Sequence, residues 1–248
     1  MEFTNKTVVI TGAGSGIGAA AAILFAQKGA HVVVSDILIE SAQQIATQIG
    51  QMALAQQTDV TDFEQVQQLM QLGFGINGRL DVLVNNAGIG PKQLLKTADH
   101  TLDDWQNVVA VNQTGVFYGM KSALSIMAKQ GIGNIVNVAS LAGLKASGNN
   151  ISYAASKFAV VGMTKSAALE YAKKNIRINA VCPAYTETAL LNQLWELKPE
   201  MRELLRAQIP MGRFGGVQEM AEAICWLASD QTGFITGQTL TLDGGASL

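Results

Sequence analysis

The chain is poor in the side chains that most often carry acid–base, metal and disulfide chemistry. Its 248 residues include only two histidines and two cysteines. Cys182 and Cys225 lie far apart and match neither a metal-ligand spacing nor a disulfide framework. The sequence therefore predicts no metal site, and it is consistent with a reduced, cytoplasmic protein.

Charge is also scarce, and no very long hydrophobic run is present. Charged residues make up 15% of the chain, with 17 basic against 19 acidic side chains, which argues against a nucleic-acid or membrane-surface role carried by bulk charge. The longest stretch of low polarity, residues 16–26, is too short to span a bilayer. The first residues run into "TVVIT" without a charged segment and a cleavage site, so we expect no secretory signal.

No proline- or glycine-rich linker divides the chain, and we expect one domain over residues 1–248. Short β-rich runs alternate with longer helical patterns, which predicts a doubly wound α/β fold with a parallel sheet and helices on both faces. The strand candidates are Thr7–Thr11, His31–Ser35, Met52–Thr58, Asp81–Asn85, Asn134–Ala139, Ile176–Val181 and Gln238–Leu242. The helix candidates are Gly16–Lys28, Ile39–Gln48, Asp62–Ile76, Leu102–Lys129, Tyr153–Lys173 and Val217–Ala228.

Two of these helices are preceded by sequences typical of capping boxes. Thr61 with Glu64, and Thr101 with Asp104, have the spacing that lets a hydroxyl and a carboxylate bond reciprocally at a helix start.

Residues 185–214 interrupt the strand–helix alternation. Apolar residues recur there at helical spacing, as at Leu190, Leu191 and Leu194, and again at Met201, Leu204 and Leu205. One interpretation is a surface helical pair that buries one face. The other is a lid over a substrate pocket, because long excursions in compact domains are often functional.

The stretch "TGAGSGIG", residues 11–18, follows the first predicted strand and opens the first predicted helix. Glycines let a backbone turn sharply and approach a ligand closely, and a helix N-terminus offers free N–H groups to a pyrophosphate. A tight turn with no ligand is the alternative. The strand before, the helix after and an acid at the end of the next strand favour dinucleotide binding.

That acid is Asp36, which ends "HVVVSD". A carboxylate at this place accepts hydrogen bonds from the adenosine ribose and repels a 2′-phosphate. Ile37 follows it and Ser15 lies in the glycine turn, so neither position supplies a cation for an extra phosphate. The sequence predicts NAD rather than NADP, and the alternative is an aspartate that only caps the next helix.

"SYAASKFAV", residues 152–160, offers a proton-transfer group that is not histidine. With Ser152 as N-cap, Tyr153 lies in the first helical turn and Lys157 one turn later on the same face. Bringing a tyrosine pKa from about 10 to about 7 needs roughly 4 kcal/mol. One unit charge at about 4 Å supplies that order at an effective dielectric of about 20. The pair can therefore perform acid–base catalysis, although a tyrosine and a lysine at this spacing also occur on ordinary half-buried helix faces.

Five motifs occur together in one order: "TGAGSGIG", "NNAG" at 85–88, "VNQTG" around Asn112, "NVASLAG" around Ser140, and "YAASK". In these motifs the chain closely resembles the short-chain dehydrogenase/reductase family over residues 7–245, in particular its single-domain members. The resemblance implies a Rossmann-like fold with a seven-stranded parallel sheet, a nicotinamide cofactor and a homotetramer.

The resemblance also implies the residue roles. Tyr153 is the general acid/base, and Lys157 lowers its pKa and holds the nicotinamide ribose. Ser140 hydrogen-bonds the substrate oxygen, and Asn112 bends its helix and holds a water that relays protons through Lys157. Each has a structural alternative, such as a turn former for Ser140 or a polar residue inside a helix for Asn112.

The cofactor-binding residues follow from the same motifs. The expected set is Gly12, Ser15, Gly16, Ile17, Gly18, Asp36, Ile37, Asp59, Val60, Asn86, Ala87, Gly88, Tyr153, Lys157, Pro183, Thr186 and Thr188. The chain departs from the family where Pro-Gly commonly follows the sixth strand. Ala184 stands there, and because alanine resists positive φ, the contacts of Thr186 and Thr188 become less certain.

The expected activity is hydride transfer between NAD(H) and a secondary alcohol or ketone. The first alternative is an NADPH-linked reductase of 3-oxoacyl thioesters on acyl carrier protein, against which Asp36 counts. Epimerisation or dehydration on the same fold, and a nucleotide-sensing protein with a vestigial site, are the others. Apolar residues are the expected pocket wall, with two asparagines as polar contacts: Leu144, Ile151, Leu190, Leu191, Leu194 and Trp195, with Asn149 and Asn150.

Overall fold

A computed structural model describes residues 2–188, 191 and 200–248. Its centre is a seven-stranded sheet in the order β3-β2-β1-β4-β5-β6-β7, and every neighbouring pair is parallel. The strands are β1 Thr7–Thr11, β2 His31–Asp36, β3 Ala53–Gln57, β4 Val82–Asn85, β5 Gly133–Val138, β6 Ile176–Pro183 and β7 Thr239–Leu242. The predicted doubly wound, Rossmann-like architecture is confirmed.

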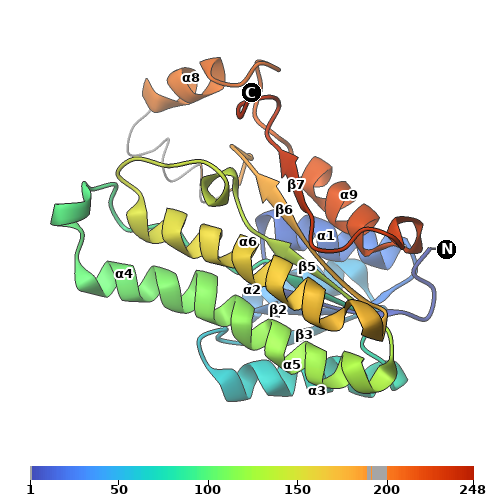
Figure 1. The fold of residues 1–248 in the computed structure, drawn as a ribbon. Helices are drawn as coiled ribbons and strands as arrows, with labels where there is room; N and C mark the ends of the chain where they lie inside the picture. The colour runs from blue at the N-terminus through green and yellow to red at the C-terminus, as the bar shows by residue number, and fades with distance from the viewer. Residues whose placement is uncertain (1, 189–190, 192–199) are drawn as a thin grey trace.

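Helices cover both faces of the sheet (Figure 1). The helices are α1 Gly16–Gln27, α2 Ile39–Ile49, α3 Phe63–Asn77, α4 Leu102–Val109, α5 Gly115–Gln130, α6 Ile151–Tyr171, α8 Glu200–Ala207 and α9 Val217–Ala228. Short 3₁₀ turns lie at Thr97–Asp99, Leu141–Gly143, Ala172–Lys174 and Asp230–Thr232. The sequences of the central strands are continuous apolar runs because both faces of these strands are buried under helices.

Two hydrophobic clusters hold the layers together. On one face α3, α5 and α6 pack residues such as Leu69, Met127 and Val160 against the sheet. On the other, α1, α2 and α9 do the same with residues such as Phe25 and Ile224. In the inner strands, alternate residues pack into the two clusters, as Val9 and Ile10 of β1 do.

The helix starts differ in part from the sequence prediction. Asp62, not Thr61, caps α3, and its carboxylate accepts from the backbone N–H groups of Glu64 and Gln65 at 2.9 and 3.2 Å. Thr61 instead bonds Asp59. The Thr101 hydroxyl accepts from Asp104 N as predicted, but the Asp104 carboxylate accepts from Lys92 N instead of completing the box.

Two further expectations about helices were wrong. The N-cap of α6 is Asn150, and Ser152 lies inside the helix, although Tyr153 remains in the first turn. The predicted helix over 102–129 is interrupted by a π-helical segment, Ala110–Thr114, that contains Asn112. Periodicity does not distinguish such an insertion, because the apolar face continues on both sides of it.

Of the predicted lid, residues 185–188, 191 and 200–214 are described, whereas Leu190, Leu194 and Trp195 lie outside the described residues. Helix α8 buries part of the predicted apolar face: Leu205 joins Ile209 and Phe214 in a small cluster that also packs against Met201. Leu204, predicted on the same face, is 61% exposed. Figure 1 shows α8 above the carboxyl ends of β6 and β7.

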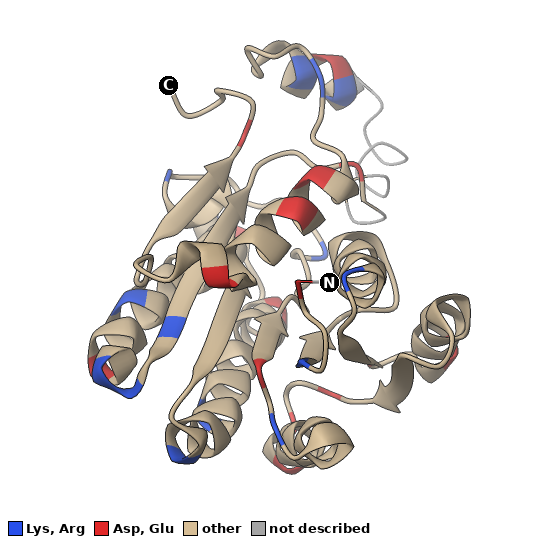
Figure 2. Ribbon diagram, turned by 90° about the vertical axis from the view of Figure 1, so that its right-hand side faces the viewer, with Lys and Arg blue, Asp and Glu red and all other residues tan. Residues whose placement is uncertain are grey.

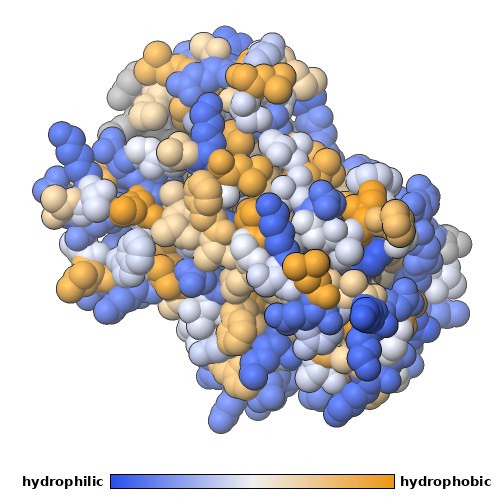
Figure 3. All heavy atoms as spheres, in the orientation of Figure 1, coloured by the Kyte–Doolittle hydropathy of each residue, from blue (hydrophilic) through white to orange (hydrophobic). Residues whose placement is uncertain are grey.

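The surface is a mosaic without a large single-sign field. Acidic and basic residues are scattered over the ribbon, with both signs on α8 (Figure 2). Polar and apolar side chains alternate over the face shown in Figure 3. Among the described helices, none is both long and apolar enough to cross a membrane.

Candidate active site

The predicted site residues meet at the carboxyl edge of the sheet. The chain order along the sheet reverses between β1 and β4, so the connections after these strands leave toward opposite faces. In open α/β sheets such a switch point forms a crevice where ligands bind. The glycine turn follows β1 and the "NNAG" segment follows β4, which brings both to this point.

The glycine turn could not be made from larger residues. Gly12 has a φ of +63°, and a Cβ there would lie 2.7 Å from Ala87 Cα. A Cβ on Gly18 would lie 2.4 Å from both Asn86 Nδ2 and Gly12 O. These glycines keep the start of α1 bare, so its free N–H groups face the crevice without a side chain in the way. The cradle fits a pyrophosphate.

Asn86 holds the turn from the β4 side. Its Nδ2 donates to Thr11 O at 3.0 Å and to Gly12 O at 2.8 Å. The Thr11 hydroxyl in turn accepts from the backbone N–H groups of Asn86 and Ala87 at 3.1 and 3.2 Å. The glycine turn, predicted to hold the pyrophosphate, is thus tied to the segment after β4 that belongs to the same predicted cofactor site.

Asp36 ends β2 beside the glycine turn. Its Oδ2 accepts from Gly14 N at 2.9 Å and its Oδ1 from Leu38 N at 3.1 Å. The carboxylate therefore supports the glycine turn and the loop before α2, but it does not cap that helix, whose N-cap residue is Leu38. Each oxygen still has acceptor capacity for a ribose hydroxyl. The side chain of Ile37 is 56% exposed next to it.

Asp59 and Val60 follow β3. Asp59 Oδ1 accepts from Thr61 N at 2.9 Å and from the Thr61 hydroxyl at 2.8 Å, a local turn that leaves Oδ2 without a bond in the structure. Val60 is buried against Gly115, so only its backbone can face the predicted adenine site.

Tyr153, Ser140 and Lys157 come together as the sequence predicted. Ser140 follows β5, its Oγ accepts from Ala142 N at 3.1 Å, and its hydroxyl also lies within hydrogen-bonding reach of the Tyr153 phenol. Lys157 is 3% exposed; its Nζ donates to Val138 O at 2.9 Å and lies 5.6 Å from the centroid of the Tyr153 ring.

The electrostatics of this trio differ from the expectation. Burial raises the pKa of Tyr153 above its ordinary value, and the hydrogen bond with Ser140 opposes that rise only in part. Burial also lowers the pKa of Lys157 to about 8. In the chain alone, desolvation of the partly buried phenol therefore sets the direction of the shift. The predicted lowering of the tyrosine pKa is wrong for the chain without its cofactor.

Asn112 is fully buried in the π-helical segment and is turned toward the segment after β4. Its Oδ1 accepts from Ile89 N at 2.8 Å, and its Nδ2 donates to Ile89 O at 2.9 Å and to Ser156 Oγ at 3.2 Å. A Cβ built on Gly88 would lie 3.3 Å from Asn112 Oδ1 and 3.4 Å from Lys157 Nζ, so both side chains border one small space.

The segment after β6 reaches the glycine turn. Pro183 ends the strand, and Thr186 forms a parallel bridge with Gly215. A Cβ on Gly16 would lie 3.6 Å from Thr188 Cγ2, which places Thr188 beside the turn. Among the described non-glycine residues, positive φ occurs only at Asn5, Asn149 and Asn175, so Ala184 fits the backbone here without strain.

Sequence reasoning missed a buried polar chain beneath the site. Asn85 Nδ2 donates to Asn137 Oδ1 at 2.9 Å, and Asn137 Nδ2 donates to Thr164 Oγ1 at 2.9 Å. These hydrogen bonds link β4, β5 and α6 just below Tyr153, Ser140 and Lys157. Asparagines inside otherwise apolar strands were the available signal.

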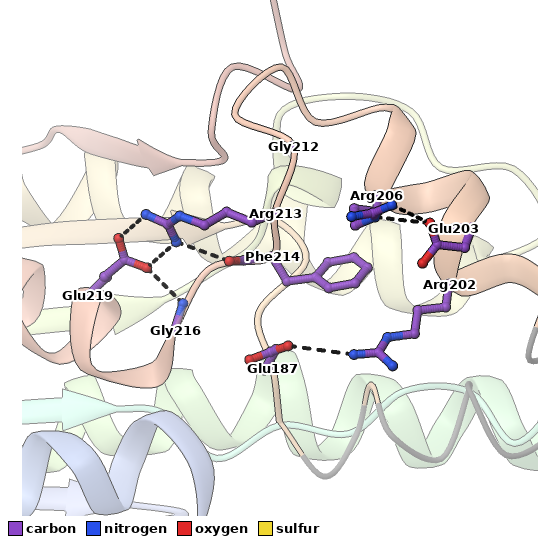
Figure 4. A pocket seen from close by; sticks show the side chains of 9 residues that line it. All are labelled: Glu187, Arg202, Glu203, Arg206, Gly212, Arg213, Phe214, Gly216 and Glu219. Carbon is purple, nitrogen blue, oxygen red and sulfur yellow. Dashed lines mark hydrogen bonds and ion pairs between the residues drawn. The ribbon is translucent and has the colours of Figure 1, made fainter.

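A pocket of about 460 Å³ lies beside α8 and α9 (Figure 4). Three arginines line it, and each pairs with a glutamate: Arg202 with Glu187, Arg206 with Glu203, and Arg213 with Glu219. Its charges are balanced, and its lining contains none of the predicted site residues.

Fold and site together define an oxidoreductase of the nicotinamide-binding Rossmann class. A family model described as enoyl-(acyl carrier protein) reductase matches residues 12–247. The chain belongs to the short-chain dehydrogenase/reductase family.

Its relatives carry different names. It is 41% identical to the 3-oxoacyl-[acyl-carrier-protein] reductase FabG of Thermotoga maritima, over 99% of both chains. It is 43% identical to cis-4-hydroxycyclohexanecarboxylate dehydrogenase of Sinomonas cyclohexanicum, over 98% of this chain and 97% of the relative. Cyclohexanol dehydrogenase of an Acinetobacter strain is 39% identical, over 98% and 95%.

Solved structures of other reductases have the same fold as this chain. Levodione reductase superposes with a TM-score of 0.95 at 35% identity, covering 99% of this chain and 98% of that one. The 3-ketoacyl-(acyl-carrier-protein) reductase of Brucella melitensis, complexed with NADH, gives 0.93 at 36% identity, covering 99% and 100%.

Proposed function

We propose that this protein is an NAD-dependent dehydrogenase/reductase that interconverts a secondary alcohol and a ketone. The observation that carries the proposal is the trio at the carboxyl edge: the Tyr153 phenol, the Ser140 hydroxyl within its reach and the Lys157 ammonium 5.6 Å from its ring. A partly exposed phenol that lies between a hydroxyl and a cation can exchange a proton with a substrate oxygen.

The nicotinamide ring supplies the hydride acceptor or donor when it is bound. The chain's own residues do the rest. Ser140 donates to the substrate oxygen and stabilises charge that develops there. Lys157, with a pKa of about 8, is mostly protonated at neutral pH and favours the phenolate of Tyr153. Asn112, which is fully buried, keeps the segment after β4 in place beside Lys157.

The decisive test of this role is Tyr153→Phe. The variant keeps the ring and its packing but has no proton to exchange, so turnover should fall by at least 1,000-fold, in the upper range of general acid–base effects. NADH binding, measured by fluorescence, should persist. Retention of most of the turnover would exclude Tyr153 as the acid/base.

We propose NAD as the cofactor. Asp36 supports this, because a carboxylate at the end of the second strand repels a 2′-phosphate and neither Ile37 nor Ser15 offsets that charge. The test compares kcat/KM for NADH and NADPH in wild type and Asp36→Asn. We expect a preference for NADH that shrinks in the variant; a wild-type preference for NADPH would defeat the proposal.

The second candidate is an NADPH-linked reductase of 3-oxoacyl thioesters, and the identity to enzymes of that name favours it. Two substrate panels distinguish the candidates. NAD reduction with cyclohexanol and other cyclic secondary alcohols or diols supports the dehydrogenase, as the names of two relatives do. NADPH oxidation with acetoacetyl thioesters, together with no NAD reduction by the alcohols, supports the alternative.

The remaining assignments belong to the same proposal. Residues 1–248 act as one domain, and residues 185–214 act as a lid over an apolar pocket. The protein works in the cytoplasm as a homotetramer, for which half-exposed apolar side chains on α4, α5 and α6 supply contact area: Trp105, Phe117 and Phe158. Sedimentation of the purified chain tests the assembly.

A further inference from the structure

Ser156 lies between the two halves of the candidate site, and none of the roles described above is assigned to it. The side chain is fully buried, one turn into α6 and directly before Lys157. Its Oγ donates to Tyr153 O at 2.7 Å and accepts from Asn112 Nδ2 at 3.2 Å. It therefore connects the backbone of the predicted acid/base to the π-helical segment.

The direction of these bonds makes the connection specific. A serine hydroxyl has one proton, and Tyr153 O takes it, so only lone pairs of Oγ remain for Asn112. Asn112 must then present its NH₂ group to Ser156, and its other amide proton goes to Ile89 O. Oδ1 is left to accept from Ile89 N. The Ser156 hydroxyl is thus a third partner that holds the buried amide in the orientation its two bonds with Ile89 also require.

The orientation of that amide reaches Lys157. Asn112 Oδ1 and Lys157 Nζ border the same small space beside Gly88. If Ser156 loses its hydroxyl, a buried N–H of Asn112 has no partner, and a buried polar group without a partner drives rearrangement. The amide, the π-helical segment and the environment of the ammonium would then change together.

We propose that Ser156 is a positioning residue that orients Asn112 and the Tyr153 turn for proton transfer. The inference rests on the proposed function of Tyr153. Ser156→Ala should lower kcat roughly tenfold, the effect of one misplaced hydrogen bond, with KM for alcohol and NAD within about twofold. The rise of kcat/KM with pH should shift to higher pH, because the ammonium supports the phenolate less well.

The chain supplies a matched control. Ser152 is also fully buried on α6, one turn earlier, and its Oγ has no hydrogen-bond partner among the described residues. Ser152→Ala should leave kcat and the pH profile unchanged. Ser156→Cys, which keeps a weak donor and acceptor of similar size, should restore part of the loss.

A second readout needs neither cofactor nor turnover. Ile89 N donates to Asn112 Oδ1, so amide hydrogen exchange at Ile89 reports the orientation of Asn112 in the chain alone. Exchange there should speed up in Ser156→Ala and not in Ser152→Ala. Ser156→Ala should also add little to the kcat loss of Asn112→Ala, because both break the same connection.

Equal kcat, pH profile and Ile89 exchange in the two serine variants would overturn the inference, as would fully additive losses with Asn112→Ala. If Tyr153→Phe stays active while Ile89 exchange responds to Ser156→Ala, the proposed function fails and only the structural link remains.

Discussion

Gly18→Ala is expected to damage folding and cofactor binding together. The added Cβ would stand 2.4 Å from Asn86 Nδ2 and from Gly12 O, a distance that real Cβ atoms do not show. Relief requires Asn86 to move, and its bonds to Thr11 O and Gly12 O then break. The two hydrogen bonds contribute about 1 kcal/mol each, and overpacking costs about 1–3 kcal/mol.

Alanine recovers up to about 1 kcal/mol of helix propensity, so the net loss of unfolding free energy should be about 2–4 kcal/mol. For a chain of this size, where 1 kcal/mol shifts Tm by about 2–4 °C, Tm should fall by roughly 4–16 °C. NADH binding should also weaken, with Kd raised at least about tenfold. The reason is that the same movement of Asn86 shifts the glycine turn predicted to hold the pyrophosphate.

Gly75→Ala is the matched control. Gly75 lies inside α3, and a Cβ there would meet nothing within 4 Å, so the variant should be stabilised by up to about 1 kcal/mol. Urea unfolding and NADH titration are compared at one protein concentration, since assembly adds to apparent stability. Unchanged Tm and unchanged Kd in Gly18→Ala would refute the contact argument.

Two further predictions concern charge and capping. Lys157 has its pKa lowered from 10.5 to about 8, so the unfolded chain binds more protons between these values and stability should rise with pH there. Relative to Lys157→Met, wild type should gain up to about 3 kcal/mol from pH 8 to 10.5 in urea unfolding; parallel curves would contradict the buried ammonium. Asp62→Ala should lower Tm by a few degrees, whereas Thr61→Ala should not, because Asp62 makes the cap. The contribution of the ionised Asp62 to the free energy of unfolding is present above the ordinary pKa of 3.8 and should be lost as the pH falls through the lower pKa of the folded state. Equal Tm values for the Asp62 and Thr61 variants would show that the cap contributes nothing to stability.

Local chemistry was readable from the sequence alone. Short β-rich runs predicted all seven strands, and the inner strands are nearly continuous apolar runs because both of their faces are buried. The glycine turn and the spacing of Tyr153 and Lys157 were readable because they depend on neighbours within one turn. The pairing of Thr101 with Asp104 N was predicted on the same ground.

The tertiary structure decided whatever depends on partners distant in sequence. Strand order brought Asn85 to Asn137, and the π-helical segment turned Asn112 toward Ile89 and Ser156. The sign of the tyrosine pKa shift was misjudged, because desolvation depends on the packing around Tyr153, and residue spacing carries no information about it. Sequence spacing determines which groups share a helix face, but burial and long-range hydrogen bonds determine what those groups can do.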